Sequence, residues 1–318
     1  MKASPVPRIS AADLDKLMAL LEVEVVALSE CRVSAGHDIE IGRHAAVGIH
    51  YVLDGCGRLV FDGASGVAVG PHALIVVPPQ VAFRLAATAC DGPPAGPAPR
   101  SEPRHELKGG VNRFSVGDTA PRTLMICGHF RAHYGASTGL FDLLATTIVE
   151  TFAPADRIDQ RLLAALDELR RQEVGAGAMS AALLKQVLVA LLRRSLVSLD
   201  TWVQRFALLS DPQVARAFAA MVADPGAPHS VQTLAGNAFL SRSAFMSRFT
   251  AAAGKSPMLV LRELRMRLAA GQLVAGAHAL EQVVRNAGYS SRSSFSRAFR
   301  KAHGTDPTEF RRLAVGGR

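Results

Sequence analysis

The amino-acid sequence predicts an α+β chain in which a strand-rich N-terminal region is followed by helices only. Three observations support this fold class. Short β-like runs separated by Gly, Pro and Asp fill residues 23–130, and from about residue 140 apolar residues recur at helical spacing. The last 90 residues contain one unit twice, 50 positions apart. A chain of 318 residues can bury more than one core, and we expect domains at 1–138, 139–222 and 223–318.

The N-terminal runs predict a mainly antiparallel sheet structure. They include "GIHYVLDG", "GRLVFDG", "ALIVVPP" and "TLMICGHF", with turn residues every 8–12 positions. Strands this short and evenly spaced are typical of a barrel or a sandwich, since a βαβ fold would place helices between them.

The middle of the chain predicts helices. "LFDLLATTIVETF", "DQRLLAALDELRRQE" and "MSAALLKQVLVALLRRSLVSL" repeat apolar residues at three- and four-residue intervals. The third stretch is apolar round most of its circumference, which suits a helix buried against a domain or a second subunit. Lys185, Arg193 and Arg194 interrupt it, so we expect no membrane span. We interpret the helices at 140–210 as the interface of a homodimer.

The repeated unit reads "LSRSAFMSRFTAAAGKSP" at 240–257 and "SSRSSFSRAFRKAHGTDP" at 290–307. Ser291 is a suitable N-cap residue for a helix in the second copy, and Gly288 suits a tight turn before it. Phe295 and Phe299 share one face of that helix, at 100° per residue. The opposite face carries hydroxyl and guanidinium groups: Ser293, Ser296, Arg297 and Arg300. Helix, glycine turn and polar-faced helix together predict a helix-turn-helix.

The first copy repeats this plan with fewer charges. Ser241 is its N-cap, Phe245 and Phe249 form the anchored face, and Arg242 near the helix start can reach a phosphate. Arg248 projects beside the Phe face, as a structural or a backbone-contacting residue. The outer face consists of Ser243, Met246, Ser247 and Thr250.

A helix between the copies begins with Pro257 at its first position. About 18 residues of helix span roughly 27 Å. Major-groove faces on one side of B-DNA lie about 34 Å apart. The spacing therefore predicts two reading helices on neighbouring turns of one duplex.

The positive charge of the chain is confined to this region. Residues 230–318 contain 14 Lys and Arg against 4 Asp and Glu, while the other 229 residues contain 22 against 23. A local cationic excess indicates a polyanionic partner, for which nucleic acid is the first candidate.

The stretches "TLAGNAFLSRSAFMSRFTAAAGKSPMLVLRELRMRLA" and "LEQVVRNAGYSSRSSFSRAFRKAHGTDPTEFRR" resemble the DNA-binding domain of AraC/XylS transcriptional regulators. The resemblance covers about the last 90 residues. It implies that the second helix of each motif enters the major groove, where Ser243, Met246, Ser247, Ser293, Ser296 and Arg297 read bases. Arg is common in the family at the position of Ser247. The full set expected on double-stranded promoter DNA is Arg242, Ser243, Met246, Ser247, Arg248, Arg292, Ser293, Ser296, Arg297 and Arg300.

The N-terminal runs resemble, more loosely, the cupin-like sensor domain of some of these regulators. Metal-binding cupins supply an H-x-H pair, a carboxylate and a later His. This chain has Gly48-Ile49-His50 at the pair and Phe83 at the later His, so we expect neither a metal nor another cofactor. The resemblance implies a small-molecule effector and RNA polymerase as a partner.

Four cysteines lie scattered without a CxxC pair, which suits reduced thiols in a cytoplasmic protein. Cys31 precedes Arg32, and a thiolate stabilised by positive charge can be oxidised. Cys31 and Cys127 are therefore either oxidant-sensing thiols or small apolar core residues.

The function predicted is a DNA-binding regulator controlled by a small molecule. A thiol-based oxidant sensor is the alternative, and a cupin enzyme with a basic tail is a third reading. No residue is identified as catalytic. An activator and a repressor are equally compatible with these residues.

Overall fold

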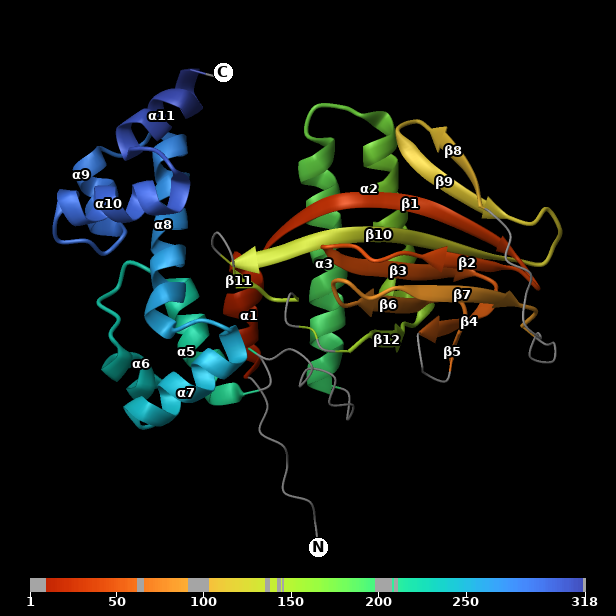
Figure 1. The fold of residues 1–318 in the computed structure, drawn as a ribbon, viewed down its shortest axis with the longest axis horizontal. Helices are drawn as coiled ribbons and strands as arrows, with labels where there is room; N and C mark the ends of the chain where they lie inside the picture. Colours follow the sequence, from red (N-terminus) through yellow and green to blue (C-terminus); the bar gives the residue numbers. More distant parts are fainter. Residues whose placement is uncertain are drawn as a thin grey trace, which may run out of the picture. The chain divides into compact units, whose positions relative to one another are not determined.

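The computed structural model describes residues 10–61, 66–90, 103–134, 138–141, 144, 146–197, 208 and 211–316. They belong to two compact units, each assembled from separate stretches of chain (Figure 1). The sheet unit comprises Glu22–Ala132 and Leu144–Trp202. The helical unit comprises Met1–Leu21, His133–Leu143 and Val203–Arg318.

The sheet unit contains two β-sheets. The larger one has the order β12-β6-β3-β10-β1-β9-β8, and the smaller one has the order β2-β7-β4-β5. The strands of the larger sheet are β1 (Glu22–Ser34), β3 (Val47–Asp54), β6 (Ala73–Val77), β8 (Arg104–Lys108), β9 (Val111–Val116), β10 (Arg122–Tyr134) and β12 (Ile148–Thr151). The strands of the smaller sheet are β2 (Asp38–Ile41), β4 (Cys56–Phe61), β5 (Val67–Val69) and β7 (Phe83–Thr88). The β3–β10, β3–β6 and β4–β7 pairs are antiparallel and β1–β9 is parallel, so the barrel-or-sandwich prediction is confirmed.

The core of this unit lies between the two sheets. Val52 of β3, Ile75 of β6 and Leu85 of β7 are fully buried in one apolar cluster that takes side chains from both sheets. Alternate strand residues point inward, as expected for a two-layer β structure.

One stretch expected to be helical is a strand. Residues 148–151 form β12, which pairs with β6 along Ile148↔Val76 and Val149↔Ile75. The β-branched residues here favour a pleated strand, and pairing with a buried neighbour outweighs the helical spacing of the apolar residues.

Helices α2 (Ile158–Arg171) and α3 (Ala176–Val197) follow the short 3₁₀ turn η1 (Pro154–Asp156). They pack against each other, α3 also contacts β1, and α2 contacts β9 (Figure 1). Within the described residues, α3 is the one helix whose length and composition would allow it to cross a membrane. Its Leu184, Val187 and Leu191 are fully buried, as in the core helix of a packed domain.

The expectation of four unpaired thiols is wrong. Cys56 and Cys90 form a disulfide with a Cα–Cα distance of 5.1 Å. Cys56 is paired with Thr88 in the β4–β7 ladder, which brings the chain two residues further on within reach. A separation of 34 residues without a CxxC pattern could not reveal this pairing. Cys31 and Cys127 are free and buried.

The helical unit is built around α5 (Pro212–Ala223). Helix α1 (Ala11–Leu20) packs against α5, and the ring of Tyr134 meets that of Phe218 edge-on at 5.1 Å. The short strand β11 (Thr138–Gly139) pairs with the end of β10. The remaining helices are α6 (Val231–Asn237), α7 (Arg242–Ala253), α8 (Pro257–Ala275), α9 (Leu280–Asn286), α10 (Arg292–His303) and α11 (Pro307–Gly316).

Candidate nucleic-acid interface

The first repeated unit folds as the helix-turn-helix α6–α7. The Ser241 hydroxyl accepts a hydrogen bond from the backbone N–H of Ala244, and Gly254 ends α7 in the left-handed conformation. Phe245 and Phe249 are fully buried, with ring centroids 5.5 Å apart. One face of α7 is therefore fixed in the core and the other is left to solvent.

The second unit folds as α9–α10 by the same local rules. Ser291 caps α10 by accepting from the Ser294 N–H, and Gly304 ends it. Phe295 and Phe299 are fully buried, and Phe299 packs edge-on against Phe310 of α11 at 5.3 Å. Both helix-turn-helix motifs, and α8 between them, lie where the repeat predicts them.

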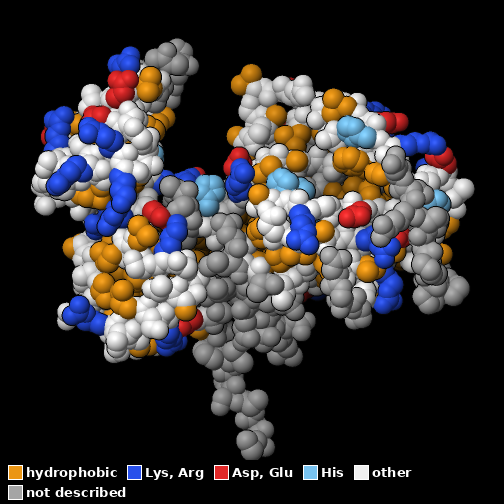
Figure 2. Space-filling model, in the orientation of Figure 1, with side chains coloured by type: hydrophobic (Ala, Val, Ile, Leu, Met, Phe, Trp, Pro, Cys, Tyr) orange, Lys and Arg blue, Asp and Glu red, His pale blue; other side chains and the backbone are white. Residues whose placement is uncertain are grey.

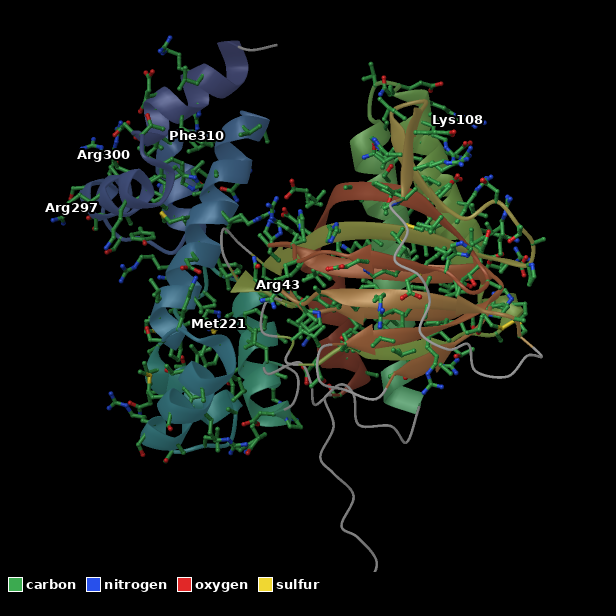
Figure 3. All side chains as sticks on the ribbon, turned by 45° about the vertical axis from the view of Figure 1, so that its right-hand side comes forward. Arg43, Lys108, Met221, Arg297, Arg300 and Phe310 are labelled. Atoms are coloured by element: carbon green, nitrogen blue, oxygen red, sulfur yellow. A yellow bond between two sulfur atoms is a disulfide. The ribbon has the colours of Figure 1, made fainter. Side chains whose placement is uncertain are left out.

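The expected DNA-contacting side chains lie on the outer faces of α7 and α10. Met246 and Ser296 are half-buried. The other eight are exposed: Arg242, Ser243, Ser247, Arg248, Arg292, Ser293, Arg297 and Arg300. Figure 3 shows Arg297 and Arg300 on the side of α10 that faces away from α8. Lys and Arg side chains gather over α9 and α10 in Figure 2, whereas hydrophobic ones are more prominent over α6 and α7.

The arginines differ in what they already bind. Arg292 lies 3.1 Å from a Glu281 oxygen, and Arg300 lies 3.4 Å from Asp306. Arg242 and Arg297 make no ion pair or hydrogen bond within the described part of the chain. Their guanidinium groups are therefore available to an external anion.

Arg248 is exposed but is bound by other residues of the protein. Its Nε lies 2.6 Å from Asp211 Oδ2, and another of its nitrogens donates to Gln213 Oε1 at 2.9 Å. Asp211 is also the N-cap of α5 and accepts from the Gln213 and Val214 N–H groups. Two roles were considered for Arg248, structural and backbone-contacting, and this geometry favours the structural one.

Sequence reasoning missed two further residues around the first motif. Gln213 donates to the carbonyl of Ala238 in the α6–α7 turn at 2.8 Å. Phe239 in that turn has a positive φ and is 76% exposed, with the Arg216 guanidinium 5.2 Å from its ring centre. The stretch "SDPQ", an N-cap residue followed by Pro, signalled the start of α5 but not these contacts.

The sheet unit was expected to receive the effector, and its interior is filled by side chains. His50 of β3 is 1% exposed, and neither of its ring nitrogens has a hydrogen-bond partner among the described residues. Burial lowers its pKa to about 3, and that of nearby His129 to about 4, so both rings are neutral at physiological pH. The described residues hold no group of three His, Cys, Asp or Glu side chains placed to bind a metal.

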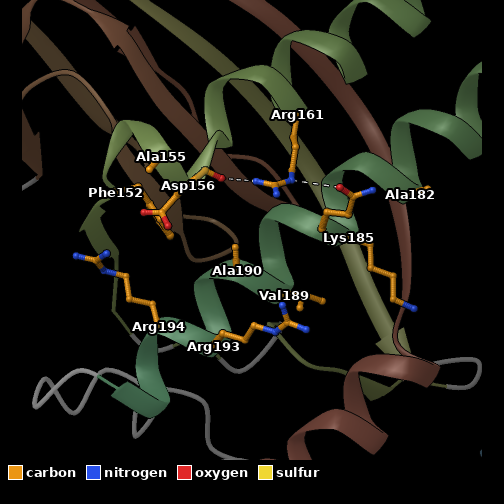
Figure 4. A pocket seen from close by; sticks show the side chains of 11 residues that line it. Phe152, Ala155, Asp156, Arg161, Ala182, Lys185, Val189, Ala190, Arg193 and Arg194 are labelled. Carbon is orange, nitrogen blue, oxygen red and sulfur yellow. Dashed lines mark hydrogen bonds between the residues drawn. The ribbon is translucent and has the colours of Figure 1, made fainter.

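A larger space lies outside the barrel, between α2, α3 and the β12–η1 turn (Figure 4). This groove has a volume of about 860 Å³ and an apolar floor of Phe152, Val189 and Ala190. Its rim carries Asp156 and four cations: Arg161, Lys185, Arg193 and Arg194.

The free thiols lie in contact. Burial and a hydrogen bond with Cys31 raise the pKa of the Cys127 thiol. Arg32 points to Glu30, 3.7 Å away, on the other face of the strand from Cys31. The positive charge of Arg32 is thus directed at Glu30, and both free thiols are buried.

Comparison with known proteins agrees with both units. A helix-turn-helix domain family matches residues 234–313, and a cupin family matches residues 13–196. A putative AraC-like transcription regulator of Streptomyces antibioticus is 30% identical over 231 residues, covering 71% of this chain and 74% of the relative. Another, from Streptomyces lividans, is 32% identical over 209 residues, covering 64% and 67%. A solved AraC-type transcriptional regulator from Chromobacterium violaceum is 26% identical and covers 33% of this chain and 95% of its own, with a TM-score of 0.32.

The matches therefore cover both parts of the chain: a cupin domain, followed by a helix-turn-helix domain that carries its motif twice. This chain belongs to the AraC-like transcriptional regulators.

Proposed function

We propose that this regulator reads promoter DNA with α7 and α10 in two successive major grooves of one duplex. The observation that carries the proposal is the matched pair of helices, each anchored by two buried phenylalanines and exposing hydroxyl and guanidinium groups. Helix α8 joins them over 19 residues, about 28 Å. That length suits grooves about 34 Å apart, because the two reading helices extend beyond its ends.

The contacts made by each arginine suggest its role on DNA. Arg297 is exposed and unpaired within the described residues, so it can bind guanine O6 and N7 in a bidentate manner. Arg242, at the start of α7, is placed to bind a phosphate together with the N-terminal dipole of the helix. Arg292 and Arg300 add phosphate contacts, and Arg248 positions α7.

In vitro selection from a random duplex library with the purified chain tests this proposal. The selected sites should be bipartite, with the two conserved blocks about one helical turn apart. Affinity should fall steeply with salt, because cations that bind phosphates release counterions. Recovery of no common sequence, or a flat salt profile, would reject it.

We also propose that the effector is an amphipathic organic anion held in the α2–α3 groove. A volume of about 860 Å³ lies within the usual range for small-ligand sites. Arg161 donates to Gln186 and Arg194 to Glu150, whereas Arg193 has no partner within the described residues. The apolar floor suits a hydrocarbon or aromatic body and Arg193 its charged end.

The fluorescent anion 8-anilinonaphthalene-1-sulfonate is a direct probe of this groove. Arg193→Ala should weaken its binding several-fold, and an uncharged analogue should bind poorly to both proteins. Arg171→Ala, on the same helix pair but outside the groove, is the matched control. Equal binding by Arg193→Ala and the unsubstituted chain would place the effector elsewhere.

A second candidate function is oxidant sensing, favoured by the contact between Cys31 and Cys127. Peroxide would accept two electrons from the two thiols, giving a disulfide and two waters. Cys31→Ser and Cys127→Ser should then abolish an oxidant response of the promoter, while Cys56→Ser leaves it in place. An unchanged response in the first two variants would remove this candidate.

We further propose that the chain acts in the cytoplasm as a homodimer through α2 and α3, contacts RNA polymerase, and has no enzymatic activity. The relatives, named as transcription regulators, support the cytoplasmic location and the lack of enzymatic activity. Sedimentation of the purified chain tests the dimer, since a monomer at micromolar concentration would contradict it.

A further inference from the structure

A direct backbone contact joins the two helix-turn-helix motifs, in addition to α8. The loop 224–229, which leads from α5 into α6, lies against the turn 286–289 between α9 and α10. A Cβ built on Gly226 would lie 2.1 Å from the carbonyl oxygen of Asn286. A Cβ on Gly288 would lie 2.6 Å from the carbonyl oxygen of Gly226. The two backbones meet closely enough that only glycine fits on either side.

Arg265 of α8 also holds the loop 224–229 in place, by donating hydrogen bonds to two of its carbonyl groups. Its Nε donates to the carbonyl of Pro225 at 2.8 Å, and a second nitrogen donates to the carbonyl of Ala227 at 2.9 Å. The guanidinium also lies 6.0 Å from the ring centre of Tyr289 in the second turn. One side chain thus touches the linker helix, the entry to the first motif and the turn of the second.

Both ends of this contact are fixed to their own motifs. Asn286 accepts a hydrogen bond from Gln282 of α9 at 2.7 Å, and it also donates to Gln272 of α8 at 3.1 Å. On the other side the loop is braced by Asp224, whose carboxylate accepts from the Ala227 N–H. Ser230, at its end, is the N-cap of α6. We call this set, the loop 224–229 with Arg265 and the turn 286–289, the inter-motif seam.

The seam restricts a pivoting motion of the two motifs that α8 alone would permit. A single helix joining two small domains allows each to pivot about its ends. A second, independent connection removes that freedom, because the two motifs are then held at two places. The relative position of α7 and α10 follows from the helix and the seam together.

We propose that the inter-motif seam is a positioning element that sets the spacing of DNA half-sites this regulator accepts. The proposal rests on the proposed use of α7 and α10 as the two reading helices. Changing the spacing by one base pair moves one half-site by about 3.4 Å and turns it by about 35°. A rigid pair of motifs cannot follow such a change, whereas a pivoting pair can.

Two substitutions break the seam without touching either outer face. Gly226→Ala wedges the loop away from Asn286, and Gly226 has no positive φ, so alanine brings no backbone strain of its own. Arg265→Met removes both donors but keeps an unbranched apolar stem similar to the aliphatic part of the arginine side chain. Their matched controls are Gly271→Ala and Arg262→Met on α8: Gly271 has open space around its Cβ position, and Arg262 is exposed.

The experiment uses the full chain and a duplex selected by it, with the two half-sites at the selected spacing and one base pair closer or farther. The unsubstituted chain should lose about tenfold or more in affinity at either altered spacing. Gly226→Ala and Arg265→Met should bind all three duplexes within about threefold, with an unchanged affinity for a duplex carrying one half-site. Both controls should keep the preference of the unsubstituted chain for one half-site spacing, even if Arg262→Met binds every duplex more weakly.

The proposal is overturned if the seam variants keep the spacing preference of the unsubstituted chain. It is also overturned if they weaken all duplexes, the single half-site included, by one common factor, since the motifs themselves would then be damaged. Arg265→Lys keeps the charge but cannot reach both carbonyls, and it should relax the spacing with the least loss of thermal stability. Failure to select any sequence would count against the proposed function, not against the seam alone.

Discussion

The two helix-turn-helix motifs derive from one repeated sequence but have different neighbours. Helix α7 contacts α5, which precedes the repeat, whereas α10 contacts α8, α9 and α11. Arg248 ties α7 to Asp211, and the ring of Phe249 lies 6.4 Å from that of Phe218, which in turn meets Tyr134. The side chains of α10 make no hydrogen bond or ion pair with α5 within the described residues.

The outer faces of the two motifs also differ, and here the second motif carries more cations. The first motif offers Arg242 and a face of serines with one methionine, because Arg248 is engaged. The second offers Arg292, Arg297 and Arg300 on one short helix. If both helices bind DNA as proposed, we expect the second motif to supply most of the electrostatic affinity. The first motif is the one whose Phe249 packs near Phe218 of α5, the helix that Tyr134 and α1 also contact.

The largest effect should come from removing one phenylalanine anchor in each motif. Phe249→Ala and Phe299→Ala should each lower the free energy of unfolding by about 3–5 kcal/mol, because each leaves a cavity in a closed core. Hydrogen exchange separates them: Phe249→Ala should also expose the amides of α5, and Phe299→Ala should leave α5 protected. Equal loss of protection in α5 in the two variants would contradict the view that the first motif, and not the second, depends on packing against α5.

Arg297 and Ser247 occupy the same position in the two copies, which allows a reciprocal test. Arg297→Ala should weaken specific DNA binding by about 1–3 kcal/mol and relax the preference at one base pair. Ser247→Arg should give the first motif a comparable contact and tighten binding to some selected sites. Equal weakening on all sequences would make Arg297 a phosphate contact.

Removing the ion pair between Arg248 and Asp211 should have a smaller effect. Arg248→Ala should cost about 1 kcal/mol of stability or less, since this ion pair is partly exposed. The salt dependence of DNA binding should not change, whereas Arg242→Ala should reduce its slope by about one. Asp211→Asn retains the N-cap and should mimic Arg248→Ala. A lower salt slope in Arg248→Ala would show that it binds phosphate.

The smallest effect is expected at Tyr134. Its buried hydroxyl has no hydrogen-bond partner in the part of the chain that the structure describes, and burial raises its pKa above the usual value. Tyr134→Phe keeps the ring on Phe218 and removes an unsatisfied polar group, so stability should rise or change by less than about 1 kcal/mol. A larger loss in a thermal melt would mean that the hydroxyl is bound in solution.

Several features of the sheet unit were beyond sequence reasoning because they depend on strand pairing. The disulfide between Cys56 and Cys90 follows from the β4–β7 register, and β12 exists because β6 is there to pair with it. The packed interior of this unit results from side chains of strands far apart in the chain, and so does the position of the α2–α3 groove.

The sequence by itself determined the repeated motifs. Ser241, Ser291, Gly254 and Gly304 act on the helix turn beside them, and the phenylalanine spacing places two rings on one face whatever surrounds them. Only the tertiary structure decided which partners those faces meet. The Arg248–Asp211 pair and the seam between Gly226 and Gly288 join residues tens of positions apart, and no local spacing encodes a distance through space.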